Sequence, residues 1–441
     1  MTKVGFISLG CSKNLVDTEV MLRKLHDAGF EITPDETEAE IIVINTCGFI
    51  ESAKQEAIDN ILDAAKLKEW GKCRHIIATG CLVERYREEV MREMPEIDAL
   101  VGVGSICDIA EACEAVMRGE KYTSFKDKNT SKLGGDRILT ADEHSAYLKI
   151  AEGCDNKCTY CAIPLIRGKF RSRTVEDIVA EARDLEALGV KELNLIAQDT
   201  SRYGLDIYGE YSLARLVREI CKATDIPWIR LLYCYPDKIT DELIEEMRNN
   251  PRLLKYMDIP IQHISDSVLT RMNRHGGKAL ICATVKKLRE RVPGIILRTT
   301  AMVGFPGETE EDFTELCEFI KEARFDRFGA FTYSEEGTAA AEFEGRVDPQ
   351  TKQDRYDILM QTQLTVTEEQ NESKIGNTYT VICDGFDTVA EIYYGRSYQD
   401  APDVDGRVYF TSKKKVEKGE FVDVKITEAL DYDLVGCRIE N

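Results

Sequence analysis

The chain has 441 residues, enough for about three domains, and its formal net charge of −21 opposes nonspecific binding to polyanions. No uncharged apolar run approaches the roughly 20 residues of a membrane span, and the N-terminal residues suit a core strand better than a signal peptide, so we expect a cytoplasmic protein. The 15 cysteines are odd in number and unevenly spaced, which favours metal or redox chemistry over a disulfide framework.

Residues 1–118 alternate apolar strands with helices, which predicts an open α/β sheet domain. The expected strands are Val4–Leu9, Ile41–Asn45, His75–Thr79 and Ala99–Val103. The expected helices are Asp17–Ala28, Ser52–Lys66, Arg85–Glu93 and Asp108–Met117. Residues 119–145 are polar and contain a Gly134-Gly135 pair, so we expect a linker there.

Three cysteines, Cys11, Cys47 and Cys81, each follow one of these strands, and we call them the strand-end cysteines. The carboxyl ends of parallel strands share one edge of a sheet, which is its usual ligand-binding edge, so we expect the three thiols to converge there as a metal-binding group. Buried structural thiols are the alternative, because they are common in protein cores. Cys107 also follows a strand, so position alone does not single out the three.

Residues 146–372 again alternate strands with helices and predict a partial (β/α) barrel, which would carry its active site on the loops after the strands. The expected strands are Leu193–Ala197, Trp228–Cys234, Tyr256–Ile261, Ile295–Met302 and Phe328–Tyr333. The run Asp354–Ser373 predicts a closing helix.

This region contains Cys154, Cys158 and Cys161, which we call the loop cysteines, at the spacing C-x-x-x-C-x-x-C. A loop this short can bind one corner of a cubane iron–sulfur cluster. Three protein ligands leave one iron open to bind a reactant, whereas four would close the cluster. A structural zinc site is the alternative, but no fourth Cys or His follows at finger-like spacing.

Residues 373–441 are rich in Val, Ile, Tyr and Thr with turn residues between them, which predicts a small antiparallel β-barrel. The stretch from Lys374 to Asn441 contains nine Lys/Arg and 13 Asp/Glu, so we expect this barrel to be acidic.

The spacing of the loop cysteines, with Tyr160 just before Cys161, resembles the signature of radical S-adenosylmethionine (SAM) enzymes. The resemblance implies that the open iron binds the methionine part of SAM and that Tyr160 lies beside the adenine. It also implies that SAM cleavage yields a radical that removes hydrogen from an unactivated carbon.

The whole layout is similar to that of the radical SAM methylthiotransferases, over essentially the entire chain. The matching stretches are Ser8–Asn14, Asn45–Phe49, Thr79–Cys81, Ala162–Pro164, Arg167-Gly168 and Arg171–Arg173. The resemblance implies a sulfur-group transferase with two [4Fe-4S] clusters. The loop cysteines (Cys154, Cys158 and Cys161) would bind the SAM-cleaving cluster. The strand-end cysteines (Cys11, Cys47 and Cys81) would bind an auxiliary cluster that carries the sulfur.

Two branches of this family share the layout: enzymes that modify an adenosine of tRNA, and an enzyme that modifies the β-carbon of an aspartate in ribosomal protein uS12. The runs Tyr256–Ser265 and Asn45–Ala53 resemble the protein-modifying branch. The C-terminal barrel resembles a TRAM domain, a module often used for RNA, but its acidity suits a basic ribosomal protein better. The run Lys413–Lys415 argues the other way, for a local RNA contact. The implied partners are uS12, an electron donor such as flavodoxin or ferredoxin, and a sulfur donor, with no membrane.

Polar residues after the barrel strands are candidates for contacts with SAM or the substrate. Gln198 and Asp199 are expected to bind the amino group of SAM. The alternative is that they are ordinary polar residues at the end of a strand. Gln262, His263 and Ser265 suit the SAM ribose or the substrate, although a lone histidine is often structural.

The loop that starts at Gly304 lacks the Lys-Ser/Thr pair of a phosphate-binding loop, and we expect it to approach the adenosine of SAM instead. Arg167, Lys169, Arg171 and Arg173 form a cationic cluster that would hold the carboxylate of SAM or the substrate aspartate. A solvated charged face is the alternative for these side chains. For the whole chain, an iron–sulfur electron carrier is the alternative from another class, and the open-site spacing and Tyr160 speak against it.

Overall fold

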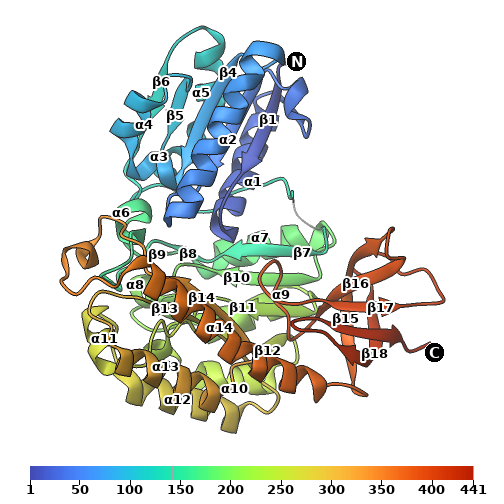
Figure 1. Ribbon diagram of the computed structural model, residues 1–441. Helices are drawn as coiled ribbons and strands as arrows, with labels where there is room; N and C mark the ends of the chain where they lie inside the picture. Colours follow the sequence, from blue (N-terminus) through green and yellow to red (C-terminus); the bar gives the residue numbers. More distant parts are fainter. Residues whose placement is uncertain (141–142, 441) are drawn as a thin grey trace.

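The chain folds into three bodies, an N-terminal lobe, a central lobe and a C-terminal barrel that lies beside the central lobe (Figure 1). This computed structural model describes residues 1–140 and 143–440. Residues 141–142 of the expected linker and residue 441 of the expected barrel therefore lie outside the described residues.

The N-terminal lobe is built on a six-stranded parallel sheet in the order β2-β1-β3-β4-β5-β6. Its strands are β1 (Lys3–Ser8), β2 (Glu31–Thr33), β3 (Ile41–Thr46), β4 (His75–Gly80), β5 (Ala99–Val101) and β6 (Tyr122–Ser124). Its helices are α1 (Ser12–Asp27), α2 (Glu51–Trp70), α3 (Cys81–Arg85), α4 (Arg87–Glu93) and α5 (Ile109–Met117). Every residue of β3 is buried, because α1 and α5 cover one face of the sheet and α2 to α4 cover the other. Chain progression reverses between β1 and β3, which leaves the crevice where such sheets bind ligands.

The structure corrects three expectations in this lobe. The edge strands β2 and β6 were not expected, because each has only three residues. Strand β6 lies within residues 119–145, the expected linker, and pairs with β5, so the first part of that segment belongs to the sheet. The helix expected at Arg85–Glu93 is divided between α3 and α4, because Tyr86 leaves the helical region with φ −117° and ψ 31°.

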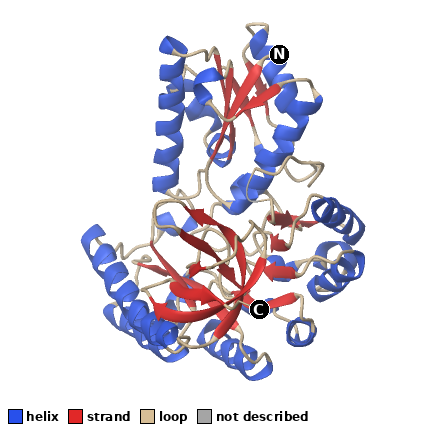
Figure 2. Cartoon of the chain, turned by 90° about the vertical axis from the view of Figure 1, so that its right-hand side faces the viewer, coloured by secondary structure: helices blue, strands red, loops and turns tan. Residues whose placement is uncertain are grey.

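The central lobe confirms the expected partial (β/α) barrel. Its parallel sheet has the order β14-β13-β12-β11-β10-β7, and the helices lie outside the strands (Figure 2). The strands are β7 (Ser145–Lys149), β10 (Glu192–Ile196), β11 (Trp228–Leu231), β12 (Leu253–Asp258), β13 (Ile296–Val303) and β14 (Arg327–Thr332), with a separate antiparallel pair, β8 (Ala151–Glu152) and β9 (Arg171–Ser172). The helices are α6 (Ile163–Arg167), α7 (Val175–Ala187), α8 (Leu205–Tyr208), α9 (Leu213–Ala223), α10 (Asp241–Asn249), α11 (Asp266–Arg271), α12 (Gly277–Arg291), α13 (Glu310–Ala323) and α14 (Pro349–Glu372).

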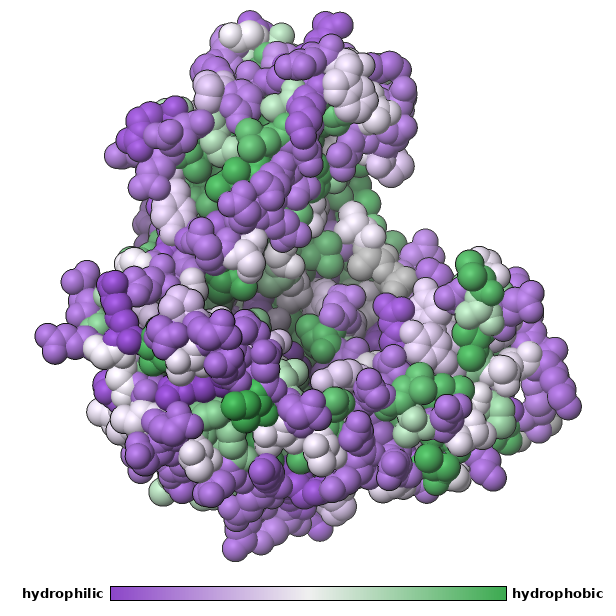
Figure 3. Space-filling model, in the orientation of Figure 1, coloured by the Kyte–Doolittle hydropathy of each residue, from purple (hydrophilic) through white to green (hydrophobic). Residues whose placement is uncertain are grey.

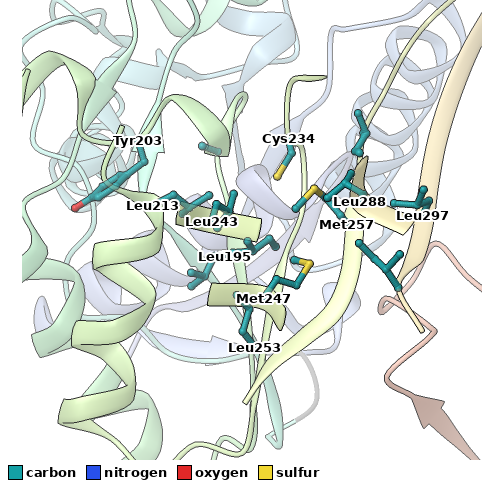
Figure 4. Close-up of a cluster of buried hydrophobic side chains, with 14 of the residues drawn as sticks. Leu195, Tyr203, Leu213, Cys234, Leu243, Met247, Leu253, Met257, Leu288 and Leu297 are labelled. Carbon is teal, nitrogen blue, oxygen red and sulfur yellow. The ribbon is translucent and has the colours of Figure 1, made fainter. Parts of the chain in front are cut away.

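Apolar side chains from neighbouring strands and the surrounding helices form one continuous core in this lobe. Leu195, Met257 and Leu297 from the strands pack with Leu213 and Leu243 from the helices (Figure 4). Because this core lies between sheet and helices, the loops at the carboxyl ends of the strands are held on a rigid base.

The C-terminal barrel is closed in the order β15-β16-β17-β19-β18. Its strands are β15 (Thr378–Asp387), β16 (Ile392–Ser397), β17 (Val408–Thr411), β18 (Phe421–Ala429) and β19 (Leu434–Arg438). Four of the five strand pairs are antiparallel, but β17 and β19 are parallel, which corrects the expectation of an entirely antiparallel barrel. The reason is geometric, because an odd number of strands cannot close with every pair antiparallel. None of the helices in the described part of the chain is long and apolar enough to cross a membrane.

Candidate active site

The three strand-end cysteines lie at the carboxyl edge of the N-terminal sheet, beside the crevice between β1 and β3. Cys11 precedes α1, Cys47 follows β3 and Cys81 begins α3 directly after β4. Cys47 and Cys81 are 8% and 5% exposed, whereas Cys11 is exposed. The group therefore has two buried thiols and one that faces the outside of the lobe.

Close backbone packing brings the three strand ends together. Gly10 has φ +91°, and a Cβ atom there would lie 2.8 Å from the Cβ of Cys47. Gly80 has φ +93°, and a Cβ atom there would lie 2.4 Å from Oδ1 of Asn45. Only glycine fits at both positions without strain. The Asn14 side chain adds a link, because its Nδ2 donates hydrogen bonds to the carbonyls of Leu9 and Thr46, each at 3.0 Å.

Burial and a neighbouring arginine act in opposite directions on these thiols. Burial raises the pKa of Cys81 to about 12, and the guanidinium of Arg167, whose Nη2 lies 3.4 Å from Sγ, acts to lower it. Burial also raises the pKa of Cys47. Metal ligation requires thiolates, so loading this group must release protons, and the cation beside Cys81 favours that release.

The loop cysteines follow β8 in a segment held from several sides by the central lobe. The amide of Cys154 donates to the carbonyl of Gly168 at 3.1 Å, and the Tyr235 hydroxyl lies 3.0 Å from the Sγ of Cys158. Thr159 donates its hydroxyl proton to the carbonyl of Arg271 at 2.8 Å. Burial raises the pKa of Cys154 to about 11 and also raises that of Cys161.

A buried polar network fixes the middle of this loop. Nδ2 of Asn156 donates to Oδ2 of Asp199 at 2.8 Å, and Nζ of Lys238 donates to Asn156 at 2.7 Å and to Asp199 at 3.0 Å. Asp199 also accepts the hydroxyl proton of Ser201 at 2.6 Å. Its carboxylate therefore helps to position the loop, and a contact between Asp199 and SAM stays a prediction.

Gln198, the other residue expected at this strand end, keeps a free acceptor. Its Nε2 donates to Oε1 of Glu152 at 2.5 Å, whereas its buried Oε1 has no hydrogen-bond partner among the described residues. A buried acceptor without a donor is costly, so this oxygen suits a ligand that carries N–H groups.

Aromatic side chains form an apolar wall beside the loop cysteines. The rings of Tyr160 and Phe305 meet edge to face at 6.5 Å, in a cluster that includes Met272 and Tyr333. The Tyr160 hydroxyl accepts a hydrogen bond from Nη1 of Arg274 at 3.2 Å. Gly304, directly before Phe305, has φ +71°.

An apolar cluster where the lobes join links the strand-end group to the segment after the loop cysteines. Cys81 and Val103 of the N-terminal lobe pack with Ala162 and Ile166, and Ala162 directly follows Cys161. On the face shown in Figure 3, the hollow between the N-terminal lobe and the bodies below it contains both hydrophobic and hydrophilic residues. The segment after the loop cysteines therefore lies against the strand-end group.

Arg167, Arg171 and Arg173 do not form the expected open cationic cluster. Arg167 is buried against Cys81, Nη1 of Arg171 donates to the carbonyl of Ser131 at 2.6 Å, and Arg173 is paired with Glu181 at 2.6 Å. Arg167 and Arg171 reach partners far away in sequence, Asp17 and Ser131, whereas Arg173 pairs with Asp177 and Glu181 of the helix that follows it. Lys169 alone is exposed.

His263 and Ser265, the candidates for a contact with the SAM ribose or the substrate, lie in a buried hydrogen-bond network, which fits the structural alternative given for His263. His263 is fully buried, its Nδ1 accepts the amide proton of Ser265 at 3.0 Å, and its Nε2 lies 3.8 Å from Oε2 of Glu308. The Ser265 hydroxyl donates to Asp312. Gln262 has φ +70°, and its backbone pairs with Ala301 beside β13. This network positions the loops after β12 and β13.

Several polar residues of this region were not expected from the sequence, namely Asn14, Asp17, Glu152, Lys238 and Arg274. Tyr235, whose hydroxyl lies 3.0 Å from Sγ of Cys158, was indicated by its position directly after an expected barrel strand. The other side chains come from α1, from the end of β8, from the short turn Pro236–Lys238 and from the loop after α11, where a polar residue has no local mark of function.

The donor chemistry fits iron–sulfur clusters. All six cysteines are free thiols. Within the described ranges, no three His, Cys, Asp or Glu side chains surround a point suited to a single metal ion. One group of three thiols at the ends of β1, β3 and β4 and a second group in the loop after β8 suit clusters that spread their ligands over several irons.

Three family profiles match the chain in the order of its lobes. The Uncharacterized protein family UPF0004 matches residues 3–102, the Radical SAM superfamily matches residues 148–320 and the TRAM domain matches residues 375–439. Among solved structures, the radical S-adenosylmethionine methyltransferase TsrM from Kitasatospora setae, determined with cobalamin and a [4Fe-4S] cluster, has a TM-score of 0.54 at 15% identity, over 75% of this chain and 72% of that one. The radical enzyme OxsB has a TM-score of 0.51 at 12% identity, over 83% of this chain and 56% of that one. At these identities the similarity shows the fold alone.

The fold and the three matching profiles define the class of protein, a radical SAM protein with a C-terminal TRAM domain. The ribosomal protein uS12 methylthiotransferase RimO of Thermoanaerobacter sp. (strain X514) is 49% identical over 438 residues, which are 99% of this chain and 100% of that protein. RimO of Clostridium botulinum (strain Eklund 17B / Type B) is 50% identical over 98% of this chain and 97% of that protein. The chain therefore belongs to the RimO family.

Proposed function

We propose that this chain attaches a methylthio group to the β-carbon of an aspartate in ribosomal protein uS12, with two [4Fe-4S] clusters and SAM as cofactors. The observation that carries the proposal is the apolar cluster at the lobe interface, in which Cys81 of the strand-end group packs with Ala162, the residue after Cys161. The relatives named for uS12 match this chain over nearly its whole length.

The loop cysteines would hold the SAM-binding cluster, and the strand-end cysteines would hold the auxiliary cluster. When bound, these cofactors supply SAM cleavage, hydrogen removal from the substrate carbon and the sulfur that is inserted. The protein would contribute the relative placement of the two clusters, because the segment after the loop cysteines packs with Cys81 at the lobe interface.

Residues around the loop cysteines have the properties needed to bind and orient SAM. The unpartnered Oε1 of Gln198 would accept a hydrogen bond from the amino group of SAM. Tyr160, whose hydroxyl is fixed by Arg274, and the ring of Phe305 would form the wall against the adenosine. These apolar faces exclude water, which protects reactive species from side reactions.

Charge supports a basic protein as the substrate. The chain has a formal net charge of −21, and its C-terminal barrel contains more acidic than basic residues, so its field attracts a basic ribosomal protein and opposes RNA phosphates. Lys413–Lys415 remains the candidate for a local RNA contact. A tRNA adenosine is the less supported substrate, because the matched relatives are named for uS12.

Two further partners follow from the proposed chemistry. Radical SAM cleavage consumes an electron, so a low-potential donor such as flavodoxin or ferredoxin is required. Each inserted sulfur must be replaced, so a sulfur donor is also required. We place the protein in the cytoplasm, where ribosomal proteins are made and assembled.

Cysteine replacements test the assignment of the two groups. Cys158→Ala should abolish the formation of 5′-deoxyadenosine from SAM and dithionite and lower the iron content by about one cluster. Cys47→Ala should lower iron similarly, retain 5′-deoxyadenosine formation and stop methylthio transfer. Cys73→Ala is the matched control, because Cys73 is buried in the same lobe but belongs to neither group.

Two results would count against the assignment: SAM cleavage that persists in Cys158→Ala, or a full iron content in Cys47→Ala. An electron carrier, the alternative of another class, would give no 5′-deoxyadenosine even before replacement. Mass spectrometry of uS12 and of tRNA after incubation with the enzyme separates the two substrates.

A further inference from the structure

Arg167 connects the segment of the loop cysteines to the strand-end group. It is the last residue of α6, which begins two positions after Cys161. Its side chain is 2% exposed and reaches into the N-terminal lobe. There Nη2 lies 3.4 Å from Sγ of Cys81 and also donates to Oδ1 of Asn14, while Nη1 donates to Oδ2 of Asp17 at 2.5 Å.

The surrounding charges are balanced across the lobe interface. Nζ of Lys149 donates to Asp17 at 2.5 Å and to Glu152 at 2.7 Å, and Glu152 lies 3.2 Å from Nη1 of Arg167. Two cations and two carboxylates therefore form one buried quartet. Arg167 is the member of this quartet that also donates to a cysteine. It therefore links the central lobe directly to the strand-end group of the N-terminal lobe.

We propose that Arg167 is a positioning residue that donates an N–H···S hydrogen bond to the Cys81 ligand and sets the reduction potential of the auxiliary cluster. The inference rests on the proposed function, because it takes Cys81 to be a cluster ligand. Hydrogen bonds to ligand sulfurs and nearby positive charge both stabilise the reduced, more negative state of an iron–sulfur cluster. The planar guanidinium can contact Cys81, Asn14 and Asp17 at once, whereas the single ammonium of lysine cannot.

The test uses the full-length chain in which the loop cysteines are replaced by alanine, so that the auxiliary cluster alone is observed. Its midpoint potential is measured by electron paramagnetic resonance during a redox titration. Arg167→Met should shift the reduction equilibrium at least tenfold toward the oxidised state, which is about 59 mV for one electron. Arg167→Lys should shift it less, because the charge remains.

A double variant separates the hydrogen bond from the net charge. Arg167→Met with Asp17→Asn removes one cation and one anion, so the Lys149–Glu152 pair stays balanced and the fold is protected from an unpaired buried charge. The midpoint potential of this double variant should still lie below that of the Arg167 parent, which is the chain that lacks the loop cysteines but keeps Arg167. The reason is that the hydrogen-bond donor to Cys81 is absent.

The outcomes are distinguishable. A potential in the double variant equal to that of the Arg167 parent, with the cluster retained, would overturn the role of Arg167 and leave the proposed function standing. A parent that binds no iron would overturn the auxiliary cluster itself and, with it, this inference. A lowered potential in both Met variants, with a smaller shift in Arg167→Lys, is the predicted result.

Discussion

Replacing Glu192 by glutamine tests how the C-terminal barrel is fixed to the central lobe. Glu192 is fully buried at the start of β10. Its Oε1 accepts a hydrogen bond from Nε of Arg230 at 3.0 Å, and its Oε2 accepts one from Nη1 of Arg396 at 2.6 Å. Arg396 belongs to β16, so one carboxylate joins the two bodies. Burial acts to raise the pKa of Glu192, but Arg396 and Arg230 hold it below its ordinary value, so the side chain is charged at neutral pH.

The expected cost follows from the charges that remain. Removing one partner of a buried ion pair costs about 3–5 kcal/mol, because an uncompensated charge stays buried. Asp384 still pairs with Arg396 at 2.9 Å, so the lower end, about 3 kcal/mol, applies here. Glutamine keeps the shape of the side chain, so no cavity is added to this cost.

Urea denaturation of the two variants Glu192→Gln and Glu219→Gln measures the effect. Glu219 is the matched control, because it pairs with Lys222 at 2.8 Å on the surface of α9, where such a pair contributes less than about 0.5 kcal/mol. Limited proteolysis should also release the C-terminal barrel sooner in Glu192→Gln. Equal losses of stability in the two variants would refute the reasoning.

Three further predictions concern stability and iron binding. Burial lowers the pKa of His263 from 6.5 to about 4, so the contribution of His263 to stability is fully present above pH 6.5 and falls by up to about 3 kcal/mol as pH drops toward 4. The variant His263→Asn should lack this contribution, so the unfolding free energy of the parent should fall relative to that of the variant across this window, and equal slopes would contradict this. Lys238→Met removes the cation that holds Asn156 and Asp199, so the amount of iron bound by the loop cysteines should fall while the auxiliary cluster remains. Electron paramagnetic resonance can distinguish the signals of the two clusters. Asp348→Ala removes the N-cap of α14 and should cost about 1 kcal/mol in urea denaturation with normal iron content; a loss of iron would show that α14 also supports the site.

The strand-end cysteines show what could be predicted from the sequence. Apolar runs place β1, β3 and β4 to within a few residues, and the parallel arrangement then puts the residue after each strand on one edge. The partial barrel follows from the same alternation of strands and helices. The strands β2 and β6 have three residues each, which is too few for a periodic pattern.

The arginines after the loop cysteines show what could not be predicted. Arg167, Arg171 and Arg173 form a local charged pattern, but their partners come from other segments, such as Asp17 in α1 and Glu181 in α7. Local sequence carries no information on which lobe will cover a side chain. For the same reason, the sequence left a structural role open beside a contact with SAM or the substrate for Asp199 and His263.

The most direct test of the central claim follows a hydrogen atom. Ribosomal protein uS12 labelled with deuterium at the β-carbon of its aspartates is incubated with the enzyme, SAM and a reductant, and both products are analysed by mass spectrometry. We predict deuterium in 5′-deoxyadenosine together with one methylthio group on an aspartate of uS12. Unlabelled 5′-deoxyadenosine and unmodified uS12, with a methylthio group gained by tRNA in a parallel reaction, would contradict the account.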